Sequence, residues 1–183
     1  MIVRYHNTLE DMVAFNRHYC AHSPAIRRTK LTYTLLVSAL LIAGSLFVPL
    51  IEGVTRPIIV AAAVVFAGLF SVVFSYTFPA LMDRQVRRLY KEGTNKGTLG
   101  QHELEIDDSG LVERTEVSES RQSWQGIERI SETEKHTFIY ISSMMAHVIP
   151  KHSVTTGDPD TFVARAKQLW LAANPDAETR QRA

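Results

Sequence analysis

The chain has 183 residues, a net charge of +1 and 45% hydrophobic residues, which on average would suit one soluble domain. The average conceals a division, because 31–51 and 57–82 contain no charged residue whereas the last hundred residues are rich in charge. With a pI near 7.9 and intermixed charges, the chain has no extended basic face for nucleic acid. Cys20 is the only cysteine, so an internal disulfide is excluded.

The first segment, 1–30, predicts a short strand at 2–6 and an amphipathic helix that begins after Thr8. Thr8 is a suitable N-cap, and the acidic residues Glu10 and Asp11 are typical of a first helical turn. The helix either packs on a cytoplasmic domain or lies on the membrane surface, and the sequence leaves both alternatives open.

The two uncharged runs predict a transmembrane hairpin at 31–82. As helices at 31–51 and 57–82, they would span about 31 Å and about 39 Å, against a hydrocarbon core of about 30 Å. The rest of a chain this short could not cover two helices that are apolar on every face. The stretch PLIEGVTRPIIV is then the tip of the hairpin, with Gly53 free to turn and Pro57 suited to a first helical turn.

Basic residues near the predicted spans indicate the orientation of the hairpin. A cleavable signal peptide is disfavoured, since about thirty residues precede the first apolar run and a second run follows it. Cationic residues prefer the cytoplasmic side, so we predict a multi-pass protein with both termini in the cytoplasm. The tip carries only Arg56, whereas the open end carries Arg27, Arg28, Lys30, Arg84, Arg87, Arg88 and Lys91.

A stripe of small residues recurs every four positions in the second predicted span. Such a stripe lets two helices approach closely in lipid. Its partner is the first span or a second copy of the chain; we favour the first span, because a short connection makes the two helices antiparallel neighbours. The absence of charge from both runs argues against a transporter. The stripe consists of Ala63, Ala67, Ser71 and Ser75.

The segment 83–97 predicts a basic extension of the second helix followed by a linker. Gly93 begins the linker, whose composition is typical of turns. The basic stripe is predicted to contact anionic lipid head groups, with a specific acidic partner as the alternative. Its residues are Arg84, Arg87, Arg88 and Lys91.

The segment 98–174 predicts a small antiparallel β-sheet that is closed by a helix. Alternating polar and apolar residues indicate strands that curl into a compact sheet. Asp158 and Pro159 are typical of a helix start, and the following apolar face would cover the open end of the sheet. The polar tail, 175–183, is predicted to be disordered. Five or six strands are expected, at 102–106, 111–117, 120–124 leading into 127–133, 137–141 and 146–150.

Four segments carry a family resemblance: GQHELEIDDSGLVERT, SWQGIERISETEKHTFIYI, VIPKHSV and DPDTFVARAKQLW. Through them the chain resembles the YcxB-like family of bacterial membrane proteins. The resemblance implies an α+β membrane protein with an N-terminal helix, two transmembrane helices and a pleckstrin-homology-like cytoplasmic domain, located in the bacterial cytoplasmic (inner) membrane. It implies no catalytic residues. The positions that carry it are Trp124, Ile127, Ile149, Pro150 and Lys151.

Candidate chemistry in the C-terminal segment is sparse. Trp124 is expected in the core. Lys151 and His152 follow a strand end and could bind an anion or a partner, although two adjacent basic residues are a weak signal. Asp107 and Asp108 in the first hairpin disfavour phosphoinositide recognition. The solvated face of a strand accounts for the acidic residues Glu103, Glu105, Asp107 and Asp108.

Motifs for catalysis or metal binding are not found in the sequence. There is no phosphate-binding glycine loop, zinc-protease helix, cysteine pair or nucleophile elbow. His18 and His22 have the four-residue spacing of two metal ligands, but no further ligand accompanies them. We therefore predict no catalytic, cofactor or metal site.

The sequence favours a noncatalytic, membrane-anchored protein-interaction or regulatory module. Its expected partners are membrane lipids and an unidentified protein, with a homo-oligomer left open. The alternative is a cryptic enzyme or lipid-binding factor at the inner membrane surface. Substitution of Lys151 or His152 would distinguish the interaction module from the enzyme. Only if these residues are catalytic would the protein lose function while folding and partner binding stay intact.

Overall fold

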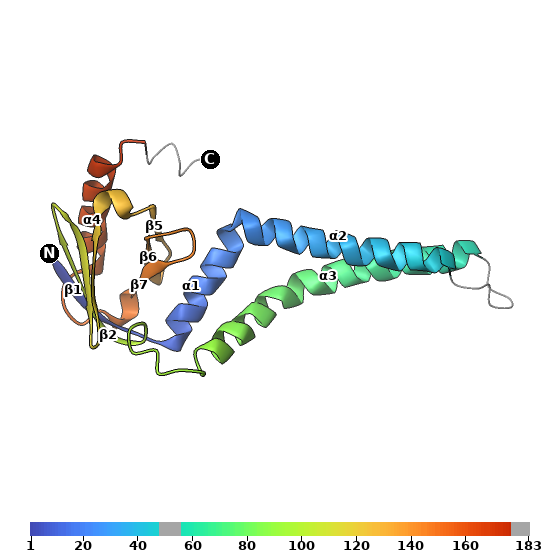
Figure 1. Cartoon of the computed structure of the whole chain (residues 1–183), viewed down its shortest axis with the longest axis horizontal. Coiled ribbons are helices and arrows are strands. Elements are labelled where there is room, and N and C mark those ends of the chain that lie inside the picture. The colour runs from blue at the N-terminus through green and yellow to red at the C-terminus, as the bar shows by residue number, and fades with distance from the viewer. Residues whose placement is uncertain (48–55, 177–183) are drawn as a thin grey trace. The chain divides into compact units, whose positions relative to one another are not determined.

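The computed structural model describes residues 1–47 and 56–176, so the predicted tip and most of the predicted disordered tail lie outside the described residues. Its chain forms two compact units (Figure 1). The sheet unit comprises 1–15 and the chain from 86 onward, and the helical unit comprises 16–85. The helices are α1 (Leu9–His22), α2 (Pro24–Phe47), α3 (Arg56–Leu89) and α4 (Pro159–Ala173).

The sheet unit contains two antiparallel sheets, which confirms the predicted α+β class. The prediction of a single small sheet was wrong, because β4 and β5 do not pair and the strands divide between two sheets. The four-stranded sheet has the order β1 (Ile2–Asn7), β2 (Gly100–Asp107), β3 (Gly110–Thr115), β4 (Glu119–Ser123). The three-stranded sheet has the order β5 (Arg129–Glu132), β6 (His136–Tyr140), β7 (Ala146–Pro150). Buried and more exposed residues alternate along β1 and β2, as expected for strands with one face on a core.

Strand β1 precedes the helical unit in sequence, whereas its partner strand β2 follows it. Val3 pairs with Leu104, and both side chains are fully buried. The strand predicted at 2–6 therefore lies in the same unit as the segment 98–174, although the whole helical unit separates them in sequence.

Helix α4 closes one end of the two sheets, as the sequence predicts. Asp158 accepts a hydrogen bond from the backbone N–H of Thr161 at 2.8 Å, so it is the N-cap, and Pro159 occupies the first turn. Trp170 is 2% exposed and its Nε1 donates to the carbonyl of Ile127 at 2.8 Å. Trp124 is also buried, within the three-residue turn η1 (Trp124–Gly126), which confirms its predicted place in the core.

The first turns of α1 cover a second apolar cluster at the sheets. Met12 belongs to this cluster together with Phe138 and Tyr140, and the ring of Phe15 lies 5.6 Å from that of Phe138. Thr8 donates from its backbone N–H and its hydroxyl to Asp11 at 2.8 Å and 2.6 Å, which fixes the start of the helix. The sequence left open whether this helix packs on a domain or lies on the membrane surface. Its first two turns pack on the sheet unit.

Within the helical unit, α2 and α3 lie side by side (Figure 1). Lys30 of α2 donates to the carbonyl of Ser75 at 3.4 Å, and its Nζ lies 5.9 Å from the ring centroid of Phe78. In the small-residue stripe, Ala67 is 4% exposed, so its side chain is covered within one chain. Ala63 and Ser71 are half-buried and Ser75 is exposed.

One helix of the described residues, Pro57–Leu89, is long and apolar enough to cross a membrane. It contains the second predicted span. The first predicted span, 31–51, extends past Phe47 and thus beyond the described part of α2. The two-helix hairpin accordingly remains a prediction.

Candidate functional site

Of the four residues in the predicted basic stripe, two have acidic partners in the structure. Arg87 forms a two-pronged ion pair with Glu10 of α1, with 2.7 Å between Nη2 and Oε2. Arg88 lies 3.8 Å from Glu92, one helical turn later, and is exposed, as are Arg84 and Lys91. Arg87 therefore links the end of α3 to the start of α1.

Lys151 and His152, the two adjacent basic residues predicted as a candidate site, face different groups. Lys151 lies in the turn η2 (Lys151–Ser153), and its Nζ is 2.7 Å from Asp160 and 3.3 Å from Glu132. The hydrogen bond with Asp160 raises the pKa of Lys151. His152 instead points its Nε2 towards Asp11, at 4.0 Å. Lys151 thus joins η2 to α4 and β5 rather than forming an anion site with its neighbour.

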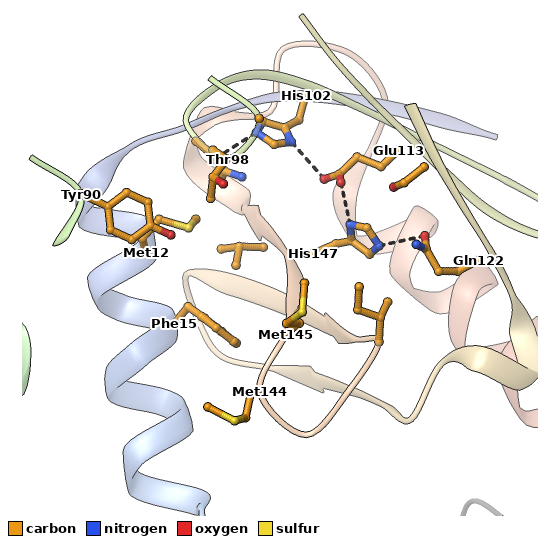
Figure 2. A pocket seen from close by; sticks show the side chains of 16 residues that line it. Met12, Phe15, Tyr90, Thr98, His102, Glu113, Gln122, Met144, Met145 and His147 are labelled. Carbon is orange, nitrogen blue, oxygen red and sulfur yellow. Dashed lines mark hydrogen bonds and ion pairs between the residues drawn. The ribbon is translucent and has the colours of Figure 1, made fainter. Parts of the chain in front are cut away.

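A cavity of about 450 Å³ opens in the sheet unit next to α1 (Figure 2). Its walls are largely apolar, and Figure 2 shows Met12 and Phe15 entering it from the helix. A cavity of this size and character is typical of a binding site. The apolar lining consists of Met12, Phe15, Ile141, Met144, Met145, Ala146 and Val148.

The cavity is lined by both connections between the two units. Met12 and Phe15 lie just before the helical unit in sequence. Tyr90 and Thr98 lie just after it and line the same cavity. Residues that precede the helical unit in sequence and residues that follow it therefore line one cavity of the sheet unit.

A hydrogen-bonded row of polar side chains forms one side of the cavity (Figure 2). Glu113 of β3 accepts from Nδ1 of His102 at 3.0 Å and from Nδ1 of His147 at 3.1 Å. His147 contacts the side-chain oxygen of Gln122 at 3.3 Å through its Nε2. Nε2 of His102 lies 3.2 Å from the carbonyl oxygen of Thr98.

Both ring nitrogens of His102 face oxygen acceptors. Nε2 faces the carbonyl oxygen of Thr98, and Nδ1 faces the carboxylate of Glu113. Burial alone would raise the pKa of Glu113, but the hydrogen bonds from His102 and His147 lower it to about 2. The row therefore places a carboxylate between two imidazoles beside an apolar space.

One polar atom of the cavity lining has no hydrogen-bond partner. Asn7 is 3% exposed and lines the cavity, and its Oδ1 is buried and unpaired. An unpaired buried acceptor costs free energy in the folded chain. The side-chain oxygen of Asn7 has almost no accessible surface, so it lies behind the cavity wall and does not face the open space.

The rim of the cavity combines exposed apolar side chains with a strand edge. Met144 and Met145 are 65% and 61% exposed. Ser120 and Gln122 of β4 also line the cavity. Among the described strands β4 pairs only with β3, so its other edge carries backbone groups that no strand of the two sheets satisfies.

Sequence reasoning placed no candidate residue in this cavity, although one signal was present. The predicted turn at 107–110 fixes a register in which Leu104 faces Glu113, as the structure has it. His102 is two residues from Leu104 and shares its inward face. The pair His102 and Glu113 could have been inferred from the hairpin, but the contribution of His147 could not.

The segment 106–164 matches the family model described as YcxB-like protein, which confirms the resemblance to the YcxB-like family. The match runs from the end of β2 into α4 and includes Glu113, Gln122 and His147 of the cavity. No curated protein and no solved structure matches this chain.

Proposed function

We propose that the chain is a noncatalytic, membrane-anchored interaction module whose sheet unit binds an extended segment of a protein partner. The proposal depends mainly on one cavity. Its lining includes residues of the edge strand β4 and residues on both sides of the helical unit in sequence. The partner segment lies along β4 and inserts an apolar side chain between the methionines.

The chemistry of the cavity suits such a segment. An added strand obtains backbone hydrogen bonds from the edge of a sheet, and its alternate side chains enter neighbouring pockets. Methionine side chains adapt to different apolar shapes, which favours Met144 and Met145 as the contact surface.

The anchor in this proposal is a two-helix hairpin in the bacterial inner membrane with both termini in the cytoplasm. The apolar length of α3 and the excess of basic residues at the open end of the hairpin support it. Arg84, Arg88 and Lys91 then face anionic head groups. The arrangement of four strands, three strands and a closing helix supports the pleckstrin-homology-like assignment.

Regulation follows from the position of the cavity. A partner that contacts Met12 and Phe15 on one side and Tyr90 on the other holds both connections in one arrangement. A ligand that binds one arrangement better shifts the population towards it. Partner binding therefore biases the membrane segment, or the membrane segment biases partner binding.

A photo-crosslinking experiment tests the proposal in native membranes. The photoreactive residue p-benzoylphenylalanine replaces Met145 in the full chain, or replaces Val117 as the control. Val117 is 59% exposed, similar to Met145, but does not line the cavity. We expect a protein adduct of one defined mass at position 145 that Met144→Lys removes, and none at position 117.

Other crosslinking results would contradict the proposal. Lipid adducts alone at position 145 would favour the lipid-binding alternative. Equal protein adducts at both positions, or none at either, would show that the cavity is not a protein-binding site. Lys151 is unsuitable for a functional test, because its ion pairs with Glu132 and Asp160 tie its substitution to folding.

A further inference from the structure

We propose that Asp11, His136 and His152 form a binding site for a zinc ion. The three side chains come from α1, β6 and η2, and their ligand atoms all lie within 4.8 Å of one another. Oδ1 of Asp11 is 2.8 Å from Nε2 of His136 and 4.0 Å from Nε2 of His152.

The set of ligands is one that zinc accepts. Two imidazole nitrogens and one carboxylate oxygen bind Zn²⁺ at about 2.0 to 2.2 Å, and a water molecule completes the tetrahedron. Neighbouring ligand atoms of such a tetrahedron lie about 3.4 Å apart. Asp11 and His136 would separate slightly to admit the ion, and the exposed side chain of His152 would move closer.

Two of the three ligands are already held in place. Thr8 donates two hydrogen bonds to Oδ2 of Asp11, so Oδ1 is left facing the histidines. The ring of His136 lies nearly parallel to that of Phe138, at an angle of 8°. Asp11 and His136 are 2% and 9% exposed, respectively. A site with two oriented, buried ligands needs only His152 to close over the ion.

The fold selects different histidines from those that sequence spacing suggests. His18 and His22, with the spacing of a metal-binding pair, lie in the helical unit with their rings stacked 4.3 Å apart. The proposed ligands, Asp11, His136 and His152, are far apart in the chain and form no motif. Because these three residues show no metal-binding spacing in the sequence, the sequence analysis predicted no metal site.

The proposed ion would fix the start of α1 within the sheet unit. It would join the segment that precedes the helical unit to β6 and η2. None of its ligands lines the cavity of about 450 Å³ described above, so the site does not depend on the proposed partner segment.

Cobalt and zinc titration of the full chain in detergent tests the site. Co²⁺ is the spectroscopic probe, because its visible absorption reports tetrahedral coordination, and Zn²⁺ should displace it. We expect one equivalent to bind to the wild type and at least a tenfold loss of affinity in His152→Gln and in Asp11→Asn. His22→Gln, the matched control, should bind as the wild type does.

Folding is checked in the same samples by tryptophan fluorescence, since both tryptophans lie in the sheet unit. His152 is an exposed side chain, and its substitution should leave this signal unchanged. The proposal fails if the wild type binds no stoichiometric metal. It also fails if binding depends on His22 and not on His152, or if a folded His152→Gln variant binds as the wild type does.

Discussion

Glu113 accepts hydrogen bonds from two histidines, and this arrangement links the stability of the sheet unit to pH. Its pKa falls from an ordinary value of 4.5 to about 2 in the folded chain. Because the folded pKa is the lower one, the stabilisation is complete above about pH 4.5 and is lost as the pH falls towards 2. The free energy involved is roughly 3 kcal/mol.

Glu113→Gln should accordingly lower the free energy of unfolding at neutral pH by roughly 3 kcal/mol and flatten its decrease between pH 5 and pH 2. Denaturant unfolding of the full chain in detergent, followed by the fluorescence of Trp124 and Trp170, measures both effects. Glu116→Gln is the control, since Glu116 is exposed. An unchanged pH profile in Glu113→Gln would mean that the two histidines do not stabilise the carboxylate.

Individual residues differ in how far the sequence predicts them. Asp158 and Trp124 were predicted correctly, because a helix cap and a strand-end tryptophan depend on neighbours in the sequence. The triad of Asp11, His136 and His152 could not be predicted, because it depends on three segments that meet only in the folded chain.

At the scale of elements, the alternation of residues predicted five or six strands in the C-terminal segment, and the structure has six, β2 to β7, within a few positions of the predicted ones. The pairing of β1 with β2 was not predictable in the same way. Hairpin strands pair through a local turn, whereas β1 and β2 are separated in sequence by the whole helical unit. No local signal at 2–6 indicates which strand it will join.

Adjacent substitutions in β1 test its place in the sheet unit. Val3 is fully buried, whereas Ile2 is 37% exposed on the opposite face. Val3→Lys should destabilise the sheet unit by more than about 3 kcal/mol, because it buries an unpaired charge. Ile2→Lys should stay within about 0.5 kcal/mol. Unfolding followed by tryptophan fluorescence gives both values, and equal effects would contradict the pairing of β1 with β2.

At the scale of the whole molecule, the predicted hairpin implies that its tip and the sheet unit lie on opposite sides of the membrane. Labelling in intact cells can test this prediction. In a Cys20→Ser background, a membrane-impermeant maleimide should label Glu52→Cys but not Lys96→Cys until the cells are opened. Glu52 belongs to the predicted tip, outside the described residues, and Lys96 is exposed in the sheet unit. Labelling of Lys96→Cys alone would invert the orientation, and labelling of both or neither in intact cells would contradict the hairpin.

The position of β1 before the helical unit also has a consequence for biosynthesis. The strand leaves the ribosome about a hundred residues before β2, its partner in the sheet. At roughly 5 to 20 residues per second, this interval lasts about 5 to 20 s. Translation that stalls within 16–85 would therefore leave β1 without its neighbour, and the four-stranded sheet could not form until the ribosome had passed the entire helical unit.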